Sequence, residues 1–257
     1  MRFCSLGSGS SGNATLIEAR SATTTSRVLV DCGFSLQELE YRLARAGLGA
    51  EQLDGLFVTH EHADHVGCAL ALARRHAVPV WMSRGTWQAI GEPELPALQF
   101  ARDGEAISIR DLELMPFTVP HDAAEPLQLR CHDGASSIGV LTDVGSITPH
   151  LLEHLRGCSA LVLECNHDSD LLAASTYPPS LKERIAGRFG HLANHTAAAI
   201  LQQTHHPGLR HLVAAHLSER NNRPALVRAA LAQACGANAE QIIVADPAFG
   251  FDWLRID

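Results

Sequence analysis

The 257-residue sequence contains no run of about 18 apolar residues, the length that a membrane-spanning helix requires. Its first ten residues, from Met1 to Ser10, lack the apolar core of a secretory signal peptide. The seven cysteines are scattered, odd in number and without a C-x-x-C pair, which argues against a disulfide framework and against a zinc ribbon. We therefore expect a soluble cytoplasmic protein with no membrane partner.

Aromatic residues are also scarce. Phenylalanine, tryptophan and tyrosine total 13, fewer than the 15 histidines. Histidine is the commonest metal ligand and titrates near neutral pH, so this balance points to metal or acid–base chemistry. Apolar residues make up 46% of the chain, enough for a large core, and no linker, charge run or repeat divides it. We expect one domain over residues 1–257.

Short apolar runs alternate with helical patterns along the chain. The early part is rich in paired strands and the later part in strand–helix units, which indicates two sheets with outer helices. Ser35 and Glu38 form the pattern of a capping box at the start of the first expected helix. The expected helices span residues 35–46, 65–75, 148–156, 179–189, 194–205 and 224–235.

Five strand candidates are followed by a residue that can bind a metal. These residues are Asp31, His60, His121, Asp143 and His216. Ligands of open α/β sheets gather outside the carboxyl ends of the strands, so these side chains can converge. For one strand alone, an ordinary turn residue is the better interpretation. Five together, three of them histidine, predict a shared site.

The segment from Thr59 to His65 carries an H-x-H-x-D-H pattern. In an extended chain, residues two apart point the same way, so His60 and His62 can chelate one ion. If the chain then enters a helix, Asp64 and His65 can face a second ion, and a negative charge is favourable at a helix start. Two metals about 3.5–4 Å apart can share a hydroxide and hold both oxygens of a displacement. The alternative is a polar loop of coincidental composition before a helix.

These motifs resemble the metallo-β-lactamase superfamily, and more closely its YycJ/WalJ-like branch of metal-dependent hydrolases and exonucleases. The resemblance covers nearly the whole chain, with motifs at 5–13, 31–33, 59–65, 120–126, 142–145, 164–168, 190–194 and 216–222. Ala193 and the Pro120 that precedes His121 stand where that branch usually has serine. This departure affects a hydrogen bond beside the ligands and leaves the ligands in place.

The resemblance implies an α/β fold, a four-layer αββα sandwich of two mixed β-sheets flanked by helices, with a dinuclear site at one edge. Zinc and manganese both suit the implied donors. Asp31 would orient the histidine loop through a hydrogen bond, unless it is only a turn residue, and His167 would lie in the outer shell. The implied ligands are His60, His62 and His121 for one ion and Asp64, His65 and His216 for the other, with Asp143 bridging.

The implied reaction is hydrolysis by a metal-bridging hydroxide. We count Asp64 and His191 as catalytic. His191 resembles the accessory histidine of ribonuclease Z-like and phosphodiesterase relatives, so it would contact phosphate or protonate the leaving group. The alternative for His191 is a loop histidine next to a helix start.

The charge distribution favours a phosphate substrate although the net charge is −8. Residues 182–228 hold seven basic and two acidic residues, which is typical of a surface that binds a phosphate backbone. The alternative for these basic residues is a solvated helix face. Asn13, Arg220 and Asn221 are the further candidate substrate contacts. The leading hypothesis is a phosphodiester hydrolase, a DNA exonuclease or related nuclease. A hydrolase of a small ester, thioester, lactam or cyclic phosphodiester is the alternative. A binding module without activity is disfavoured, since every ligand position is filled.

Overall fold

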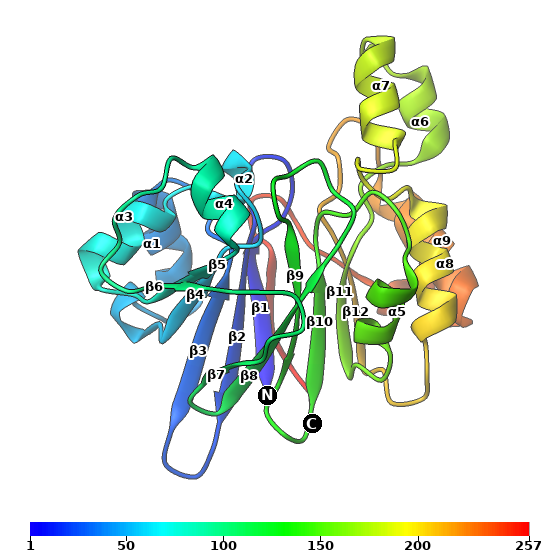
Figure 1. Ribbon diagram of the computed structural model, residues 1–257. Coiled ribbons are helices and arrows are strands. Elements are labelled where there is room, and N and C mark those ends of the chain that lie inside the picture. The colour runs from blue at the N-terminus through cyan, green and yellow to red at the C-terminus, as the bar shows by residue number, and fades with distance from the viewer. Residues whose placement is uncertain (257) are drawn as a thin grey trace.

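Two seven-stranded β-sheets pack face to face in the computed structural model, which describes residues 1–256 (Figure 1). The first sheet runs in the order β14 (Phe251–Arg255), β1 (Arg2–Gly7), β2 (Ala14–Arg20), β3 (Thr25–Val30), β4 (Gly55–Phe57), β5 (Val80–Met82) and β6 (Leu98–Phe100). The second runs in the order β13 (Ile243–Val244), β12 (His211–Ala215), β11 (Ala160–Glu164), β10 (Ser137–Leu141), β9 (Leu127–His132), β8 (Leu112–Thr118) and β7 (Ile107–Ile109).

Strand direction brings the carboxyl ends of many strands to one edge of the sandwich. Strands β3 to β6 are parallel in the first sheet, and β10 to β13 are parallel in the second. Strand β8 is antiparallel to β9, which is antiparallel to β10, so β8 points the same way as β10. This edge is where an α/β sheet gathers ligands.

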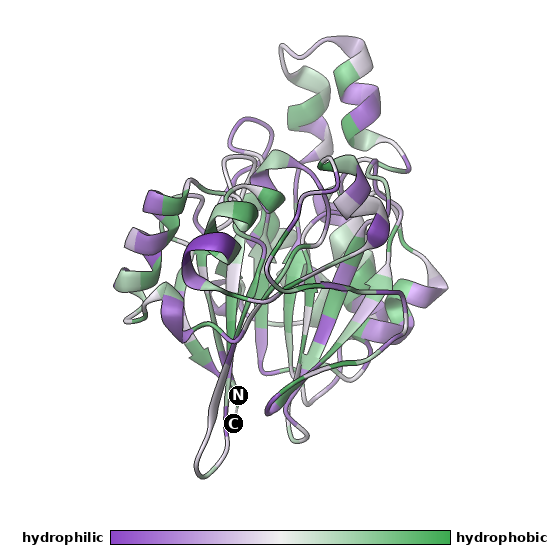
Figure 2. Ribbon diagram, turned by 60° about the vertical axis from the view of Figure 1, so that its left-hand side comes forward, coloured by the Kyte–Doolittle hydropathy of each residue, from purple (hydrophilic) through white to green (hydrophobic). Residues whose placement is uncertain are grey.

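Strand alternation divides the core into three layers. Val28 and Val30 on β3 face the second sheet, whereas Leu29 between them faces outward to helix α1 (Leu36–Arg45). On β10, Val140 joins the core between the sheets and Leu141 the outer layer. This period of two is what the pleat of a strand requires. Figure 2 shows that the central strands consist mostly of hydrophobic residues.

Helices cover both outer faces, as the four-layer αββα prediction states. On the first sheet lie α1, α3 (Ala69–His76) and α4 (Arg84–Ala89), and on the second lie α5 (Pro149–Leu155), α8 (Asn194–Thr204) and α9 (Pro224–Cys235) (Figure 1). Helices α6 (Ser169–Ala174) and α7 (Pro179–Ala186) project beyond the sandwich at the edge where α2 (Ala63–Val66) lies. We call α6 and α7 with their connection, residues 169–186, the arm. No helix among residues 1–256 combines the length and the apolar character that crossing a bilayer demands.

Most expected helices form close to their predicted bounds, but the one expected at 65–75 is broken. It consists of α2 and α3, separated at Gly67 and Cys68. Gly67 has φ +30°, and a Cβ there would lie 2.3 Å from the carbonyl oxygen of Cys32, so the chain must turn at this contact. Ser35 accepts a hydrogen bond from the Glu38 amide at 3.3 Å, which is the Ser35 half of the predicted capping box, whereas the Glu38 carboxylate accepts a hydrogen bond from Arg42 Nε at 2.7 Å. All seven cysteines are free thiols.

Candidate metal centre

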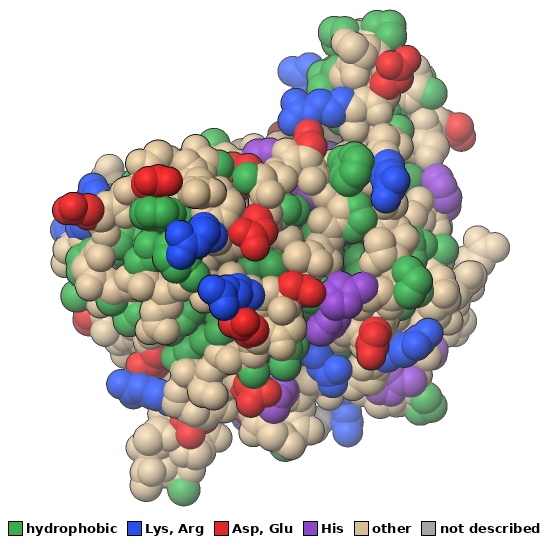
Figure 3. Space-filling model, in the orientation of Figure 1, with side chains coloured by type: hydrophobic (Ala, Val, Ile, Leu, Met, Phe, Trp, Pro, Cys, Tyr) green, Lys and Arg blue, Asp and Glu red, His purple; other side chains and the backbone are tan. Residues whose placement is uncertain are grey.

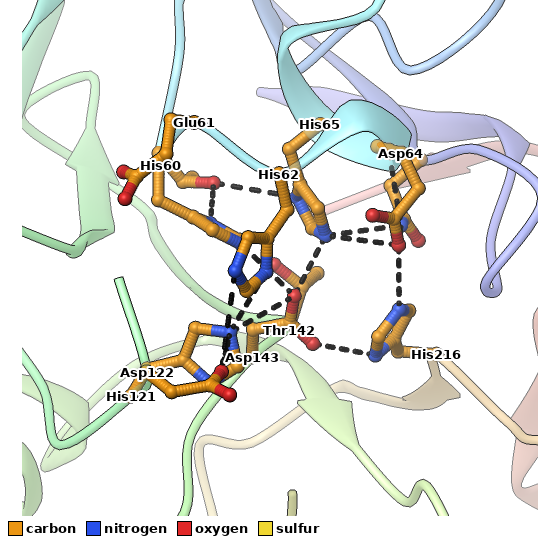
Figure 4. A network of polar contacts seen from close by, with 12 residues as sticks. His60, Glu61, His62, Asp64, His65, His121, Asp122, Thr142, Asp143 and His216 are labelled. Carbon is orange, nitrogen blue, oxygen red and sulfur yellow. Dashed lines mark hydrogen bonds and ion pairs between the residues drawn. The ribbon is translucent and has the colours of Figure 1, made fainter. Parts of the chain in front are cut away.

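The residues that follow five strands meet at this edge of the sandwich (Figure 4). His60 follows β4, and Asp143 follows β10 on the other sheet. The two side chains are almost completely buried, and His60 Nε2 lies 3.2 Å from Asp143 Oδ2. His121 follows β8 and His216 follows β12. The site is therefore built across both sheets, and its geometry depends on how they pack.

Three histidines surround one side of Asp143. His62 Nδ1 and His121 Nε2 are 3.3 Å apart, and His121 Nε2 lies 3.7 Å from Asp143 Oδ2. One donor atom from each of His60, His62, His121 and Asp143 falls within 4.8 Å of all the others. His121 Nδ1 donates to the Gly190 carbonyl at 3.1 Å, which leaves Nε2 for a ligand.

A second group shares Asp143. His65 Nε2 lies 2.8 Å from Asp143 Oδ2, and His216 Nε2 lies 3.3 Å from Asp64 Oδ2. Donor atoms of Asp64, His65, Asp143 and His216 also lie within 4.8 Å of one another. The two groups contain the seven residues that the sequence nominates as metal ligands, and Asp143 belongs to both.

The turn into α2 divides the histidine motif between the two groups of candidate ligands. His62 is the last extended residue, with φ −61° and ψ 145°, and α2 begins at the next residue. His60 and His62 thus lie before the turn, and Asp64 and His65 after it. Gly33 allows this turn to pack closely, because a Cβ at Gly33 would lie 1.7 Å from the Asp64 carbonyl oxygen.

Asp31 holds the histidine motif from behind. Its Oδ2 accepts a hydrogen bond from His65 Nδ1 at 2.7 Å, and its Oδ1 accepts one from the Thr59 amide at 2.8 Å. The first contact orients the His65 ring so that Nε2 points into the cluster. Asp31 has φ +61°, in the left-handed region, and is buried. Asp31 therefore has the hydrogen bonds that the predicted orienting role requires, and the role itself stays a prediction.

The donor set fits divalent metal ions. Two ligand atoms on one tetrahedral ion, each about 2.1 Å from it, lie about 3.4 Å apart, close to many of the distances above. His60 Nε2 is fully buried and has no hydrogen-bond partner within residues 1–256, although a buried polar atom normally has one. A cation between these side chains would satisfy it. Imidazole and carboxylate donors suit zinc and manganese alike.

Burial and neighbouring charges shift the pKa values of the cluster. Burial lowers the pKa of His60 to about 4, so this imidazole is neutral at neutral pH, as a ligand must be. Burial opposes a charge on His65, but the Asp143 and Asp31 carboxylates raise its pKa well above the usual range. The pKa of Asp143 is held well below its usual range, despite burial, by the charges of His216, His65 and His191.

Glu164, the last residue of β11, is a member of the site that the sequence interpretation left without a role. Its Oε1 accepts a hydrogen bond from His191 Nδ1 at 2.7 Å and lies 3.1 Å from His216 Nδ1. Its Oε2 accepts hydrogen bonds from the amides of Val144 and Leu192. Burial would lower the pKa of His191, but Glu164 and Asp143 raise it to about 10. Glu164 directly follows the apolar run of residues 160–163, so the rule that found the predicted ligands would have identified it too.

The predicted substrate contacts occupy different environments. Asn13 is buried, and its Nδ2 lies 3.4 Å from Asp64 Oδ2 and 3.2 Å from His65 Nε2, a placement that supports the histidine motif. Asn221 is also buried, and its carbonyl accepts a hydrogen bond from the Asp168 amide. Arg220 is exposed, with its guanidinium 5.8 Å from the centre of the Tyr177 ring.

His167 lies beneath the site. Its backbone bonds to Leu192 and Asn194, which ties the segment after β11 to the start of α8. The side chain is buried, and this burial lowers the pKa of His167 to about 4, so the ring is neutral.

An open cavity of about 230 Å³ lies over the cluster. Asp64, Asp143 and His216 form part of its floor, and His191 reaches it with 23% of its side chain exposed. Ser10 of the β1–β2 loop and three side chains of the arm, Leu181, Arg184 and Ile185, complete the walls. A substrate that enters the cavity would reach the histidine cluster, His191 and Arg184 together.

Comparison with known proteins agrees with this geometry. The model of the "Beta-lactamase superfamily domain" family matches residues 26–217. The exodeoxyribonuclease YycJ of Bacillus anthracis is 33% identical over 237 residues, which is 91% of this chain and 88% of that protein. The exodeoxyribonuclease WalJ of Streptococcus pneumoniae is 29% identical over 262 residues, 100% of this chain and 93% of that protein. The metallo-β-lactamase fold protein YhfI of Bacillus subtilis superposes with a TM-score of 0.75 at 16% identity, over 99% of each chain.

Proposed function

Since the chain belongs to the metallo-β-lactamase superfamily and is a metal-dependent hydrolase, we propose that it cleaves phosphodiester bonds of nucleic acid, as a DNA exonuclease. The observation that carries the proposal is the cavity in which the histidine cluster meets His191 and Arg184. Both of these side chains suit a phosphate oxygen. The relatives that match over nearly the whole chain are named exodeoxyribonucleases, which favours DNA as the substrate.

Seven residues would hold two divalent ions, zinc or manganese. His60, His62 and His121 are assigned to one ion, Asp64, His65 and His216 to the other, and Asp143 to both. When bound, such ions lower the pKa of a water molecule and offset the charge of a phosphate. The chain's own contribution is to fix the donors: Asp31 orients His65, and the Gly190 carbonyl orients His121.

His191 is placed to act on the substrate itself. Glu164 accepts the Nδ1 hydrogen bond, so Nε2 is the nitrogen left to contact a phosphate oxygen or to give a proton to the leaving oxygen. Asp64 is assigned to metal binding and, through its position on the cavity floor, to the catalytic centre. Asn13 and Asn221 support the surrounding loops, and Arg220 is free at the surface for a more distant part of a nucleic acid strand.

A reconstitution experiment tests this proposal. The metal-free protein is loaded with zinc or manganese and incubated with DNA and RNA labelled at the 5′ or 3′ end, with a small phosphodiester, and with a lactam and a thioester. We expect stepwise shortening of DNA from one end. Cleavage of the lactam or thioester with every phosphodiester intact would overturn the nuclease proposal and leave the metallo-hydrolase assignment standing.

A further inference from the structure

Helix α7 presents apolar side chains to the metal cavity. None of its residues is buried, and its half-buried Leu181 and Ile185 line the cavity. These two positions are four apart and therefore lie on the same helix face. An eight-residue helix is marginal by itself, and most helical stability comes from packing an apolar face. The apolar face formed by Leu181 and Ile185 is therefore only partly covered, and it is turned toward the histidine cluster.

The chain holds α7 in a fixed position above the cluster. The His191 amide donates to the Ile185 carbonyl at 2.8 Å, so the last turn of α7 is bonded to a residue of the site. At Gly190, a Cβ would lie 2.2 Å from the carbonyl oxygens of both Arg184 and Ile185, which shows how closely the chain folds back. The position of α7 relative to His191 is therefore part of the fold.

Arg184 links α7 to the ligand loop. Its Nε lies 2.6 Å from Asp122 Oδ2, and Asp122 Oδ1 lies 3.5 Å from His121 Nε2. A guanidinium has five N–H donors, and this contact uses the one on Nε. The side chain is 64% exposed and lines the cavity. Its remaining donors can take a phosphate oxygen close to the histidine cluster.

We infer that α7 forms a nucleoside subsite, in which Leu181 and Ile185 contact the nucleoside beside the scissile phosphate and Arg184 contacts a phosphate oxygen. The inference rests on the proposed function and extends it to the part of the substrate that flanks the bond. The apolar side chains suit the nucleoside, and the neighbouring guanidinium and histidine cluster suit its phosphate. Residues 179–190 carry three basic side chains and one acidic one, which complements that substrate. Figure 3 shows basic side chains on the flank of the arm nearest the main body, with histidine side chains in the hollow beneath.

Three p-nitrophenyl phosphodiesters, one without and two with a nucleoside, test the inference. They are methyl p-nitrophenyl phosphate and the p-nitrophenyl esters of thymidine 5′- and 3′-phosphate, all of which release p-nitrophenolate. In the metal-loaded wild type we expect kcat/KM to be at least tenfold higher for one of the thymidine esters. Leu181→Asp and Ile185→Asp should each reduce that preference at least tenfold, mainly through KM, because a nucleoside that covers the new carboxylate would remove its hydration. Leu181→Ala and Ile185→Ala should reduce it less.

Leu226→Asp is the matched control, because Leu226 is 40% exposed on α9 and lies outside the cavity lining. It should keep the wild-type preference. Calorimetric titration gives a second readout: thymidine monophosphate should bind at least tenfold more weakly to Ile185→Asp, with inorganic phosphate affected less. If the ratio of kcat/KM between the thymidine and methyl esters is the same in the wild type and the variants, the subsite is refuted and the phosphodiesterase proposal survives. If no phosphodiester is hydrolysed, both fail.

Discussion

Glu164 Oε1 accepts a hydrogen bond from His191 Nδ1 at 2.7 Å, and this contact joins the end of β11 to the wall of the metal cavity. The same oxygen lies 3.1 Å from His216 Nδ1. One carboxylate thus orients the histidine proposed to act on the substrate and a histidine proposed to bind metal. Hydrogen bonds of this kind set ring orientation and tautomer, so we expect Glu164 to act as a positioning residue.

Glu164→Gln should reduce kcat about ten- to a hundredfold, in line with the usual effect of removing a group that orients a ligand. Glutamine keeps the size of the side chain but loses the charge that holds both imidazoles. Steady-state kinetics with a phosphodiester, together with its pH profile, measures the effect, since an altered His191 environment shifts the profile. Glu113→Gln is the control, because Glu113 pairs with His132 at 2.8 Å on the surface of the second sheet. Equal kinetics and pH profiles for the two variants would contradict the positioning role.

His191→Ala should lower turnover at least a hundredfold while the protein keeps its full metal content. General acid or base groups contribute about 10²–10⁴-fold, and His191 is not among the seven proposed ligands. Elemental analysis after dialysis, run beside the kinetic assay, separates the two effects. If the variant loses metal in proportion to activity, His191 belongs to the metal shell instead.

The sequence was sufficient to predict that the seven proposed ligands come together, because their positions follow from strand periodicity and strand direction. Asp143 and His216 each come one or two residues after an apolar strand, and parallel strands bring such positions to one edge. Glu164 directly follows the apolar run of residues 160–163, but the rule was not applied to that strand, so the residue was missed. The break at Gly67 depends on a contact with the Cys32 carbonyl, which no local pattern encodes.

Charge alone could not show which basic residues of the segment 182–228 lie at the cavity. Of its arginines, Arg184 lines the cavity, whereas Arg228 donates to the Ile242 carbonyl and Arg223 to nearby backbone carbonyls. Likewise, the periodicity of residues 179–189 predicts a helix but not that Leu181 faces the metal cluster. Such assignments depend on tertiary packing, which joins segments far apart in the sequence.

Asp31→Asn should weaken metal binding about tenfold or more with the fold retained. Asparagine tolerates the left-handed conformation at φ +61°, but a neutral oxygen holds the His65 ring less firmly and makes its Nε2 a poorer donor. Competition with a chromogenic chelator measures the affinity. Asp252→Asn on β14 is the control, since that side chain is exposed and far from the cluster in sequence and in sheet order. Identical affinities in the two variants would refute the orienting role of Asp31.

Glu18, which lies away from the histidine cluster, should make the stability of the fold fall at acid pH. Hydrogen bonds from Arg2, Arg27 and Arg20 outweigh burial and lower the pKa of Glu18 to about 2, below the value of about 4.3 in an unfolded chain. A lowered folded-state pKa stabilises the fold above the unfolded pKa, and this contribution is lost as the pH falls from about 4.5 to 2. We expect it to be about 1–2 kcal/mol at neutral pH, because Arg20 is 60% exposed and the solvent screens its charge.

Urea unfolding of the wild type and Glu18→Gln at pH 7 and pH 3 measures this contribution. The variant should be less stable at pH 7, and the difference should shrink toward pH 3, because below a pH of about 4.3 Glu18 takes up a proton when the chain unfolds, which favours the unfolded wild type. Comparing the two proteins cancels the acid sensitivity of the histidine cluster, which both share. A difference that stays constant between the two pH values would contradict the assignment.

Asp143 is proposed to join two groups of histidines into one site for two ions, and metal stoichiometry in Asp143→Ala tests this proposal most directly. Elemental analysis of zinc- and manganese-loaded protein should give two ions per chain for the wild type and for Asp252→Ala. Asp143→Ala should lose affinity for both ions and all detectable hydrolysis, while circular dichroism shows the fold retained. Two tightly bound ions in Asp143→Ala, or a single ion in a fully active wild type, would contradict the account.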